Sequence, residues 1–176
     1  MTEELGLRGE RVTLRRVSAT DTERLTAILT APAVAQWWPG YDADRVRREY
    51  THLDPADADG EMAFIVEVDG EPIGLIQCHE EDEPDYRHAG IDIALHPAWH
   101  GRELGPEAIR ILAHWLFEVR GHHRLTIDPA ADNEAAIRSY AKVGFRPVGR
   151  MRQYERGADG TWHDGLLMDL LRDELA

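Results

Sequence analysis

The sequence is poor in cysteine and in basic residues, and each shortage narrows the kind of protein it can encode. Its single cysteine, Cys78, excludes an internal disulfide and fits a cytoplasmic location, where thiols stay reduced. Against 33 Asp and Glu residues there are only 20 Lys and Arg, which gives a formal net charge of −13. This charge argues against nucleic acids and anionic membranes as partners. It suits a polycationic ligand, and it equally suits a protein that is simply very soluble.

Long apolar runs are also missing. The longest, at residues 111–117, is interrupted by His114 and is far shorter than a membrane-spanning helix. The opening residues lack the basic start and apolar core of a signal peptide. No repeat, low-complexity segment or interdomain linker divides the chain. From 176 residues with 43% hydrophobic side chains we expect one globular domain over residues 1–176, acting as a monomer or homodimer.

The most informative stretch is a strand, a capped helix and a second strand over residues 125–149. Asp128-Pro129 ends the first apolar run, because proline continues neither a strand nor a helix easily. Asp132 or Asn133 then caps a helix, and Gly144 follows its last turn, where a left-handed residue is favoured. Helical spacing predicts one apolar face on this helix, made by Ile137, Tyr140, Ala141 and Val143.

The rest of the chain alternates strand and helix patterns. Period-two hydrophobicity predicts strands over residues 11–16, 62–68, 73–79, 88–95, 148–154 and 162–170. Helices are predicted from a Thr20–Glu23 capping box, over residues 42–53 and over residues 106–119. Asp69-Gly70 and residues 157–160 indicate hairpin turns, with a turn-rich linker at 54–60 and a tail at 172–176. This order predicts a mixed α/β sheet.

A family resemblance is carried by the helix described above. Asn133, Ala136, Tyr140 and Gly144-Phe145 resemble the C-terminal motif of the GNAT acyltransferase superfamily, and the surrounding string resembles the aminoglycoside 6'-N-acetyltransferases within it. Four other stretches match the same group in the same order, so the resemblance covers most of the chain. They are Trp37-Trp38, Gly70–Gly74, Gly90-Ile91-Asp92 and the loop His100–Gly105.

The resemblance implies both a fold and an activity. The fold would be a single GNAT-like α/β domain, in which a mixed, mostly antiparallel sheet with splayed central strands is flanked by helices. The protein would use acetyl coenzyme A, without a metal, to acetylate the 6'-amine of an aminoglycoside antibiotic in a ternary complex, an activity that confers resistance. Alternative acceptors are a protein N-terminus, as in the ribosomal-protein acetyltransferases, and a siderophore-type amine. A further alternative is a non-catalytic regulator that binds coenzyme A.

The loop from His100 to Gly105 is the predicted phosphate cradle of the coenzyme, because backbone N–H groups at a helix start bind phosphate. It departs from the family pattern at His100, which replaces Gln or Arg, and at Glu103, which replaces a glycine. Glu103 either points to solvent, paired with Arg102 or Arg110, or crowds the phosphates. By resemblance, the coenzyme-binding residues are Ile93, Leu95, His100, Gly101, Arg102, Glu103, Leu104, Gly105, Asn133 and Tyr140.

Two residues are the predicted catalytic groups, again by resemblance. Asp92, which lies in an apolar strand pattern, would position the amine or take its proton. Tyr140 would give a proton to the departing thiolate, since a positioned phenol can serve as a general acid. The structural alternatives are a surface aspartate at position 92 and a core tyrosine at position 140.

The predicted acceptor site combines aromatic and acidic residues from distant segments. Several carboxylates facing one cleft would suit a ligand with several ammonium groups. Each member also has a simpler explanation: the tryptophans as loop anchors, the acidic loop at residues 80–85 as a solvated turn, and Asp164 as a turn former whose match could slip to Asp159. The predicted substrate-binding residues are Trp37, Trp38, Tyr50, Asp85, Asp92, Asp128 and Asp164.

Other catalytic or metal-binding readings are weaker. His96 and His100 have a metal-like spacing, but Pro97 lies between them and no acidic partner is fixed, so no metal site is predicted. Cys78 is expected to be an inert strand cysteine. Ser139 lacks the glycine context of a nucleophilic serine.

Overall fold

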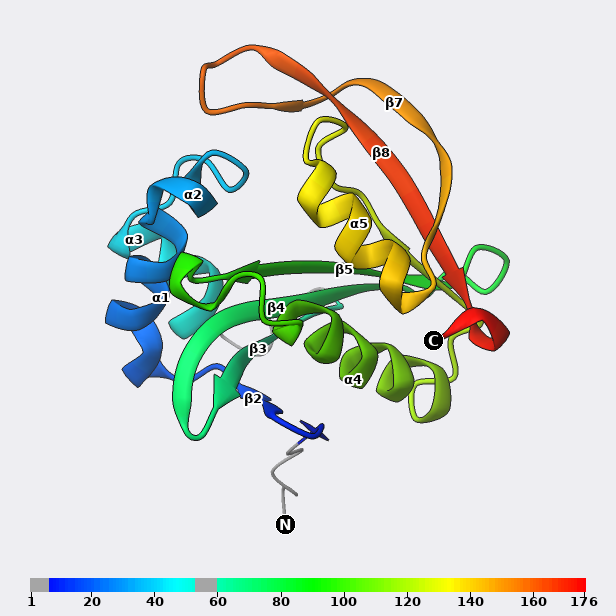
Figure 1. Cartoon of the computed structure of the whole chain (residues 1–176), viewed down its shortest axis with the longest axis horizontal. Helices are drawn as coiled ribbons and strands as arrows, with labels where there is room; N and C mark the ends of the chain where they lie inside the picture. Colours follow the sequence, from blue (N-terminus) through cyan, green and yellow to red (C-terminus); the bar gives the residue numbers. More distant parts are fainter. Residues whose placement is uncertain (1–6, 53–59) are drawn as a thin grey trace.

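The computed structural model describes residues 7–52 and 60–176, and it folds them around one eight-stranded sheet (Figure 1). The strand order is β1-β2-β3-β4-β5-β6-β8-β7. Every neighbouring pair is antiparallel except β5 and β6, which run parallel. The strands are β1 (Leu7–Arg8), β2 (Val12–Arg16), β3 (Glu61–Val68), β4 (Glu71–Glu81), β5 (His88–Leu95), β6 (Arg124–Ile127), β7 (Arg146–Arg156) and β8 (Trp162–Leu171).

Helices cover the sheet. The main ones are α1 (Thr22–Thr30), α2 (Pro32–Ala35), α3 (Ala43–Val46), α4 (Leu104–Glu118) and α5 (Glu134–Val143). A π-helical turn η2 (Arg47–Thr51) continues α3, and short 3-10 turns are η1 (Ala19–Asp21), η4 (Pro97–Trp99) and η5 (Arg172–Glu174). Within the described ranges, no helix is both long and apolar enough to cross a membrane.

Alternating side chains divide the interior into two cores, one on each face of the sheet. On β3, Phe64 and Val66 pack in the larger core with α4 and α5, whereas Ile65 points to the opposite face. There it meets Leu25 and Leu29 of α1 in the smaller core. This alternation confirms the strand predicted over residues 62–68, and it places the buried face of α1 against the sheet.

Helix α5 has the ends that its sequence predicts. The side chain of Asn133 accepts a hydrogen bond from the N–H of Ala136 at 3.2 Å. Gly144 closes the helix with a φ of 116°, and a Cβ at that position would lie 2.1 Å from the carbonyl oxygen of Glu174. Only glycine fits this turn. Of the predicted apolar face, Val143 is buried and Ala141 is exposed.

The sheet splits at its parallel junction. Strands β5 and β6 are paired only at Ala89–Leu125 and Gly90–Thr126. Beyond these pairs β5 continues to Leu95 without β6 beside it. The predicted splayed central strands are therefore confirmed, and the splay leaves room between the two halves of the sheet.

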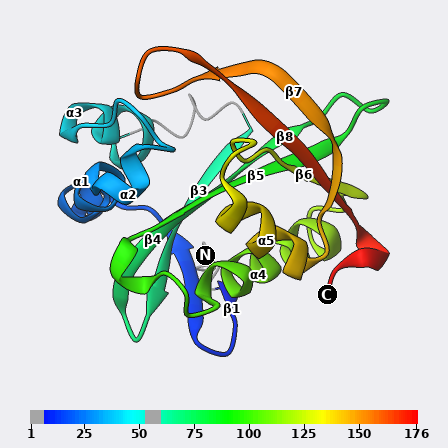
Figure 2. The same cartoon turned by 45° about the horizontal axis from the view of Figure 1, so that its top comes forward.

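The last two strands form a long hairpin that reaches across the molecule. Figure 2 shows the β7–β8 pair arching over α5, with its tip on the side where α2 and α3 lie. The tip turns at Gly157–Gly160, where Gly160 has a φ of 78°. The predicted hairpin is confirmed, and its tip brings residues of β7 toward the segment that follows α2.

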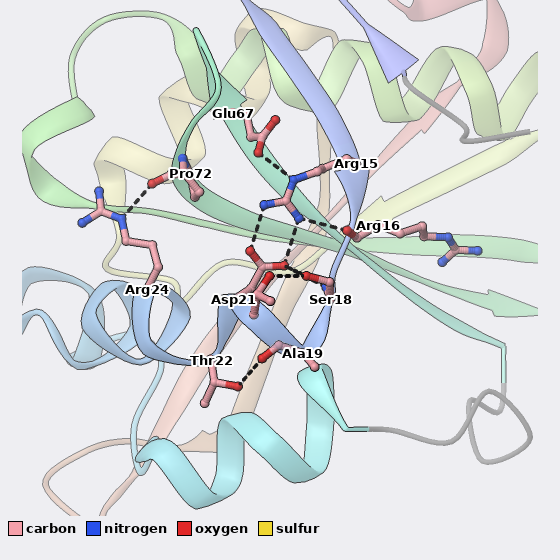
Figure 3. Close-up of polar contacts among 10 residues, drawn as sticks. Arg15, Arg16, Ser18, Ala19, Asp21, Thr22, Arg24, Glu67 and Pro72 are labelled. Carbon is pink, nitrogen blue, oxygen red and sulfur yellow. Dashed lines mark hydrogen bonds and ion pairs between the residues drawn. The ribbon is translucent and has the colours of Figure 1, made fainter.

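A buried ion pair fastens the start of α1 to the sheet (Figure 3). The carboxylate of Asp21 accepts two hydrogen bonds from Arg15, at 2.8 and 2.9 Å, and one from the N–H of Ser18 at 2.8 Å. Arg15 also donates to Glu67 on β3 at 2.6 Å. The capping box is thus formed by Ser18 and Asp21, so the prediction of a Thr20–Glu23 box was wrong. Asp21 takes this role because its carboxylate bonds both the N–H of Ser18 and the guanidinium of Arg15.

Three other local predictions need correction. The helix predicted over residues 42–53 is a short α3 followed by a π-helical turn, and its last residue lies outside the described residues, as does most of the predicted linker at 54–60. Glu80 belongs to β4 rather than to a solvated loop, because it is buried against Arg120 at 2.8 Å and His122 at 2.6 Å. The predicted tail is a 3-10 turn, and the N–H of Ala176 bonds the carbonyl of Val143 at 2.9 Å.

Candidate active site

A cavity of about 990 Å³ opens where β5 and β6 part. Its walls come from β5, the loop that opens α4, the segment after β6, α5, and the residues around α2 and α3. Two residues of β7, Tyr154 and Glu155, complete it. The cavity therefore collects side chains from segments that are far apart in the sequence.

The loop His100–Gly105 lines one end of this cavity, and most of its backbone N–H groups lack a hydrogen-bond acceptor among the described residues. In the described part of the chain, no protein backbone acceptor bonds the N–H groups of residues 101–105. Gly101 has a φ of 71°, and a Cβ built there would meet no atom within 4 Å. The ring Nε2–H of His100 donates to the carbonyl of Leu95 at 2.7 Å, which ties the loop to the end of β5. The loop thus presents free donors to open space, as a phosphate cradle requires.

Glu103 lies in this loop with a φ of 61°, the left-handed region that glycine occupies at least cost. Its exposed side chain forms an ion pair with Lys142 in the last turn of α5. The solvent-facing orientation agrees with the first of the two predicted arrangements, but the partner is Lys142 rather than Arg102 or Arg110. Lys142, Arg110 and Arg11 together lower the pKa of Glu103.

Basic side chains surround this end of the cavity. The guanidinium of Arg102 lies 4.9 Å from the centre of the Trp99 ring. Arg138 also lines the cavity and bonds Glu134 at 3.3 Å on the surface of α5. With Lys142, these residues make the loop end of the cavity the cationic end.

Asp92 occupies the opposite end, on the splayed part of β5. It faces Gln77 across the β4–β5 ladder, and the Gln77 amide donates to its carboxylate at 3.4 Å. The side chain of Asp92 is exposed, and it lines the cavity. Desolvation by the surrounding cavity walls, together with the nearby charge of Asp128, raises the pKa of Asp92 to about 6. Such a carboxylate can accept a proton near neutral pH.

Tyr140 lies across the cavity on α5 and packs partly against the larger core. Burial raises the pKa of its phenol, and the carboxylates of Asp92 and Asp128 raise it further. The hydroxyl therefore keeps its proton at neutral pH and can give it to a stronger base. Asn133 also lines the cavity, so it is both the helix cap and a cavity residue.

A second carboxylate group lies next to Asp92. Asp128, at the end of β6, accepts a short hydrogen bond from the hydroxyl of Tyr154 on β7. Burial raises the pKa of Asp128, and burial together with Asp128 raises that of Glu155. The pKa values of these carboxylates are raised first by desolvation, and those of Asp92 and Glu155 also by the charge of Asp128. A bound cation would favour the charged form of each carboxylate.

Aromatic residues around α2 and α3 form the remaining wall. Trp37 and Trp38 line the cavity as predicted, and Trp38 also packs in the smaller core, so it anchors the segment too. The ring of Tyr41 lies 6.1 Å from that of Trp38 and 4.0 Å from the guanidinium of Arg45. Arg45 is paired with Glu49 at 2.7 Å, so its charge is balanced locally.

Three predicted substrate-binding residues do not line the cavity. Tyr50 lies behind Tyr41, with their hydroxyls 2.9 Å apart. Asp85 is exposed in the turn between β4 and β5. The carboxylate of Asp164 is occupied by Arg150 at 2.7 Å and by the N–H of Gln153 at 2.9 Å. All other predicted coenzyme- and substrate-binding residues line the cavity.

Several cavity residues were not predicted from the sequence, namely Tyr41, Arg45, Gln77, Arg138, Lys142, Tyr154 and Glu155. Strand pairing could have identified Gln77, because a residue opposite Asp92 follows from the hairpin register. The other six come from segments whose position depends on tertiary packing, and no local pattern marks them.

His96 and His100, the two histidines with metal-like spacing, both bond the protein backbone. Within residues 7–52 and 60–176, no group of three His, Cys, Asp or Glu side chains is arranged to hold a metal ion. His96 accepts a hydrogen bond from the N–H of Ala98 at 3.2 Å, and His100 is engaged with Leu95. Cys78 is buried in the larger core, where burial raises the pKa of its thiol to about 12.

Comparison with known proteins points to one family. A family model described as an acetyltransferase (GNAT) domain matches residues 11–146. Aminoglycoside N(6')-acetyltransferase type 1 of Klebsiella pneumoniae is 31% identical over 154 residues, which cover 78% of this chain and 75% of that protein. Spermidine N(1)-acetyltransferase of Escherichia coli K12 is 28% identical over 114 residues, which cover 65% of this chain and 60% of that protein.

Solved structures give the same fold. The aminoglycoside acetyltransferase AAC(6')-Ib, solved with paromomycin and acetyl-CoA, superposes on the chain with a TM-score of 0.75. The two chains are 26% identical, and the superposition covers 94% of this chain and 96% of that one.

Proposed function

The chain belongs to the GNAT acetyltransferase family, and from this premise we propose that it acetylates the 6'-amine of an aminoglycoside. Acetyl coenzyme A is the acetyl donor, as in the related structures solved with it. The proposal goes beyond the family assignment in naming the acceptor and the residues that handle it.

The observation that carries the proposal is the opposite charge of the two ends of one cavity. Arg102, Arg138 and Lys142 line the loop end together with one carboxylate, Glu103, whereas Asp92, Asp128 and Glu155 line the other end. In a chain with a net charge of −13, cations gathered beside free backbone N–H groups favour a polyanionic coenzyme. Three carboxylates at the other end favour an acceptor with several ammonium groups.

The residues present fit coenzyme A. Free N–H donors at residues 101–105 and open space at Gly101 suit a pyrophosphate at the start of α4. The unpaired edge of β5 at Ile93 and Leu95, with Asn133 across the cavity, provides polar backbone and amide groups for the pantetheine arm. When bound, the coenzyme supplies the acetyl thioester.

In the proposed reaction, Asp92 accepts a proton from the amine and Tyr140 donates a proton to the sulfur. The acceptor amine enters as an ammonium ion, and the Asp92 carboxylate takes its proton, directly or through water, so that the nitrogen can attack. A carbon–nitrogen bond forms, the carbon–sulfur bond breaks, and the Tyr140 hydroxyl gives a proton to the leaving sulfur. The nitrogen then loses its second proton to give the amide, and that proton, passed through water, restores the Tyr140 hydroxyl. Cys78 is buried in the core rather than in the cavity, which supports direct transfer without an acyl-enzyme.

A second candidate acceptor is a linear polyamine, which the similarity to spermidine N(1)-acetyltransferase favours. Both acceptors are polycations, so the carboxylates do not discriminate between them. The aromatic wall of Trp37, Trp38 and Tyr41 favours a ligand with flat ring faces over a flexible chain, because aromatic side chains commonly stack on sugar rings. The aminoglycoside is therefore the preferred acceptor.

Thiol release with acetyl coenzyme A and a panel of acceptors tests the proposal. The panel holds kanamycin, spermidine and a peptide with a free N-terminus. Kanamycin should give the highest kcat/KM, its mass should rise by one acetyl group, and NMR should place that group on the 6' nitrogen. Turnover of spermidine or the peptide without turnover of any 6'-amino aminoglycoside would overturn the proposed acceptor.

A further inference from the structure

We infer that Lys142 binds a phosphate group of the coenzyme, and that Glu103 competes with the coenzyme for Lys142. The inference rests on the proposed use of coenzyme A. It assigns roles to two residues that the family loop does not explain, since Glu103 stands where the pattern has glycine.

The first supporting observation is the place of the ion pair. Glu103 belongs to the loop that opens α4, and Lys142 belongs to the last turn of α5, 39 residues later in the chain. Both side chains line the cavity, and each is about half exposed. The pair therefore spans the cationic end of the cavity, from one helix to the other.

The second observation is that the backbone of Lys142 is fixed. The guanidinium of Arg110 donates to the carbonyl of Lys142 at 3.2 Å and to that of Ala176 at 2.6 Å. The backbone of Lys142 is therefore held in place, while its flexible side chain lets the ammonium group change position. A compact cation of this kind can leave one anionic partner for another without movement of the helix.

The third observation is that positively charged side chains surround Glu103. Lys142, Arg110 and Arg11 lower the pKa of this carboxylate, so it is ionised across the physiological range. Its side chain makes no helix cap, although it stands at the N-cap position. At the start of α4, the Glu103 carboxylate is therefore held by the same positive charges that would attract a phosphate. A coenzyme phosphate would draw Lys142 away from Glu103, whose exposed side chain is then free to turn to solvent, so binding exchanges one ion pair for a stronger one.

A double-mutant cycle measured by calorimetry tests the inference, with coenzyme A as the ligand and no acceptor present. Glu103→Gln should tighten the Kd by about two- to fivefold, the size expected for one solvent-screened charge. Lys142→Gln should weaken it by about five- to tenfold. In the Lys142→Gln background, Glu103→Gln should change the Kd by less than about 1.5-fold, because the competition has gone.

The matched control is Glu118→Gln. Glu118 is paired with Arg172 on the surface, is about as exposed as Glu103, and does not line the cavity. The substitution changes the net charge by the same amount, so it should leave the Kd unchanged. An equal gain in this variant would mean that overall charge, rather than competition for Lys142, sets the affinity.

Dephospho-coenzyme A identifies the phosphate. If Lys142→Gln weakens both ligands equally, Lys142 binds the pyrophosphate; if its effect disappears with dephospho-coenzyme A, it binds the 3'-phosphate. The inference is overturned if Glu103→Gln leaves the Kd unchanged or weakens binding, or if its gain persists without Lys142. Failure of the wild-type protein to bind coenzyme A would overturn the proposed function as well, which separates the two failures.

Discussion

At the scale of single residues, Asp92, the proposed catalytic carboxylate, is expected to lower the stability of the folded protein at neutral pH. Its folded pKa of about 6 lies above the ordinary value of 3.8 because protein surrounds it and Asp128 lies nearby. Folding therefore favours the protonated carboxyl. The stabilisation from that proton is complete below about pH 4 and is lost as the pH rises through 6.

Asp92→Asn should therefore stabilise the protein at pH 7.5 and have little effect at pH 4. Thermal unfolding at both pH values measures this, with Asp85→Asn, in the exposed turn after β4, as the control. A gain in melting temperature that is the same at both pH values would contradict the assigned pKa shift.

The same substitution should lower turnover, by about 10²- to 10⁴-fold if Asp92 takes the proton of the amine. The wild-type rate should fall below about pH 6 as Asp92 becomes protonated, and the variant should lose this limb of the pH profile. Near-normal rates across pH would mean that Asp92 only supports the structure.

Tyr140→Phe should lower kcat by more than about tenfold and leave the KM of the acceptor nearly unchanged. Its proton is needed only when sulfur leaves, and the raised pKa of the buried phenol keeps that proton available. Steady-state kinetics with kanamycin separates the two constants. A rise in KM at constant kcat would instead make Tyr140 a binding residue.

At the scale of elements, the position of α1 depends on the ion pair between Asp21 and Arg15 (Figure 3). Asp21 is 4% exposed, and its carboxylate serves both the cap and the guanidinium. The chain continues from α1 through α2 to the tryptophans of the cavity wall. Any loosening of α1 is thus transmitted to the predicted acceptor site.

Asp21→Ala should lower the free energy of unfolding by about 1–3 kcal/mol, because it removes two hydrogen bonds of Arg15 and leaves the Ser18 N–H without its acceptor. Denaturant unfolding provides the measurement. Asp44→Ala is the control, since Asp44 pairs with Arg47 on the surface and should contribute less than about 0.5 kcal/mol. Equal losses in both variants would show that burial of Asp21 is unimportant.

The elements also show what the sequence could predict. Helix α5 was predicted with both ends because Asn133 and Gly144 act within a few residues of themselves. The Asp69-Gly70 hairpin was predicted for the same reason, and Asp69 has the expected positive φ of 51°. By contrast, Glu80 was assigned to a solvated loop because its partner His122 lies 42 residues away. No local pattern reveals a pairing of that range.

The site follows the same rule. The loop His100–Gly105, Asp92 and Tyr140 were identified through their likeness to family motifs, and the structure brings them to one cavity. Tyr154 and Lys142 were missed because their partners, Asp128 and Glu103, lie 26 and 39 residues away. Asp164 was assigned to the site by its resemblance to a third acidic position of the family, yet its carboxylate is occupied by Arg150.

At the scale of the whole molecule, the division of charge within the cavity should separate the two substrates. Asp128→Asn should raise the KM of the acceptor by several-fold and leave that of acetyl coenzyme A nearly unchanged. Asp164→Asn, outside the cavity, is the matched control and should alter neither. Equal effects on both substrates would mean that Asp128 does not belong to the acceptor site.

Acceptor binding should also weaken as salt is added, because the Debye length falls to roughly 8–10 Å near physiological ionic strength. The slope of affinity against salt should be smaller in Asp128→Asn than in the wild type. Calorimetry with kanamycin at several salt concentrations measures both slopes, and parallel slopes would contradict the electrostatic role.

In mechanical terms, the split sheet is two stiff plates that share a narrow joint. One plate holds β1 to β5 and the other holds β6, β8 and β7, and in the described part of the chain two residue pairs of β5 and β6 join them within the sheet. A small rotation at the joint moves the far ends of β5 and β6 by a larger distance, while the hydrogen bonds within each plate stay intact. Substitutions at Gly90 or Thr126, where β5 and β6 pair, would therefore change the width of the cavity.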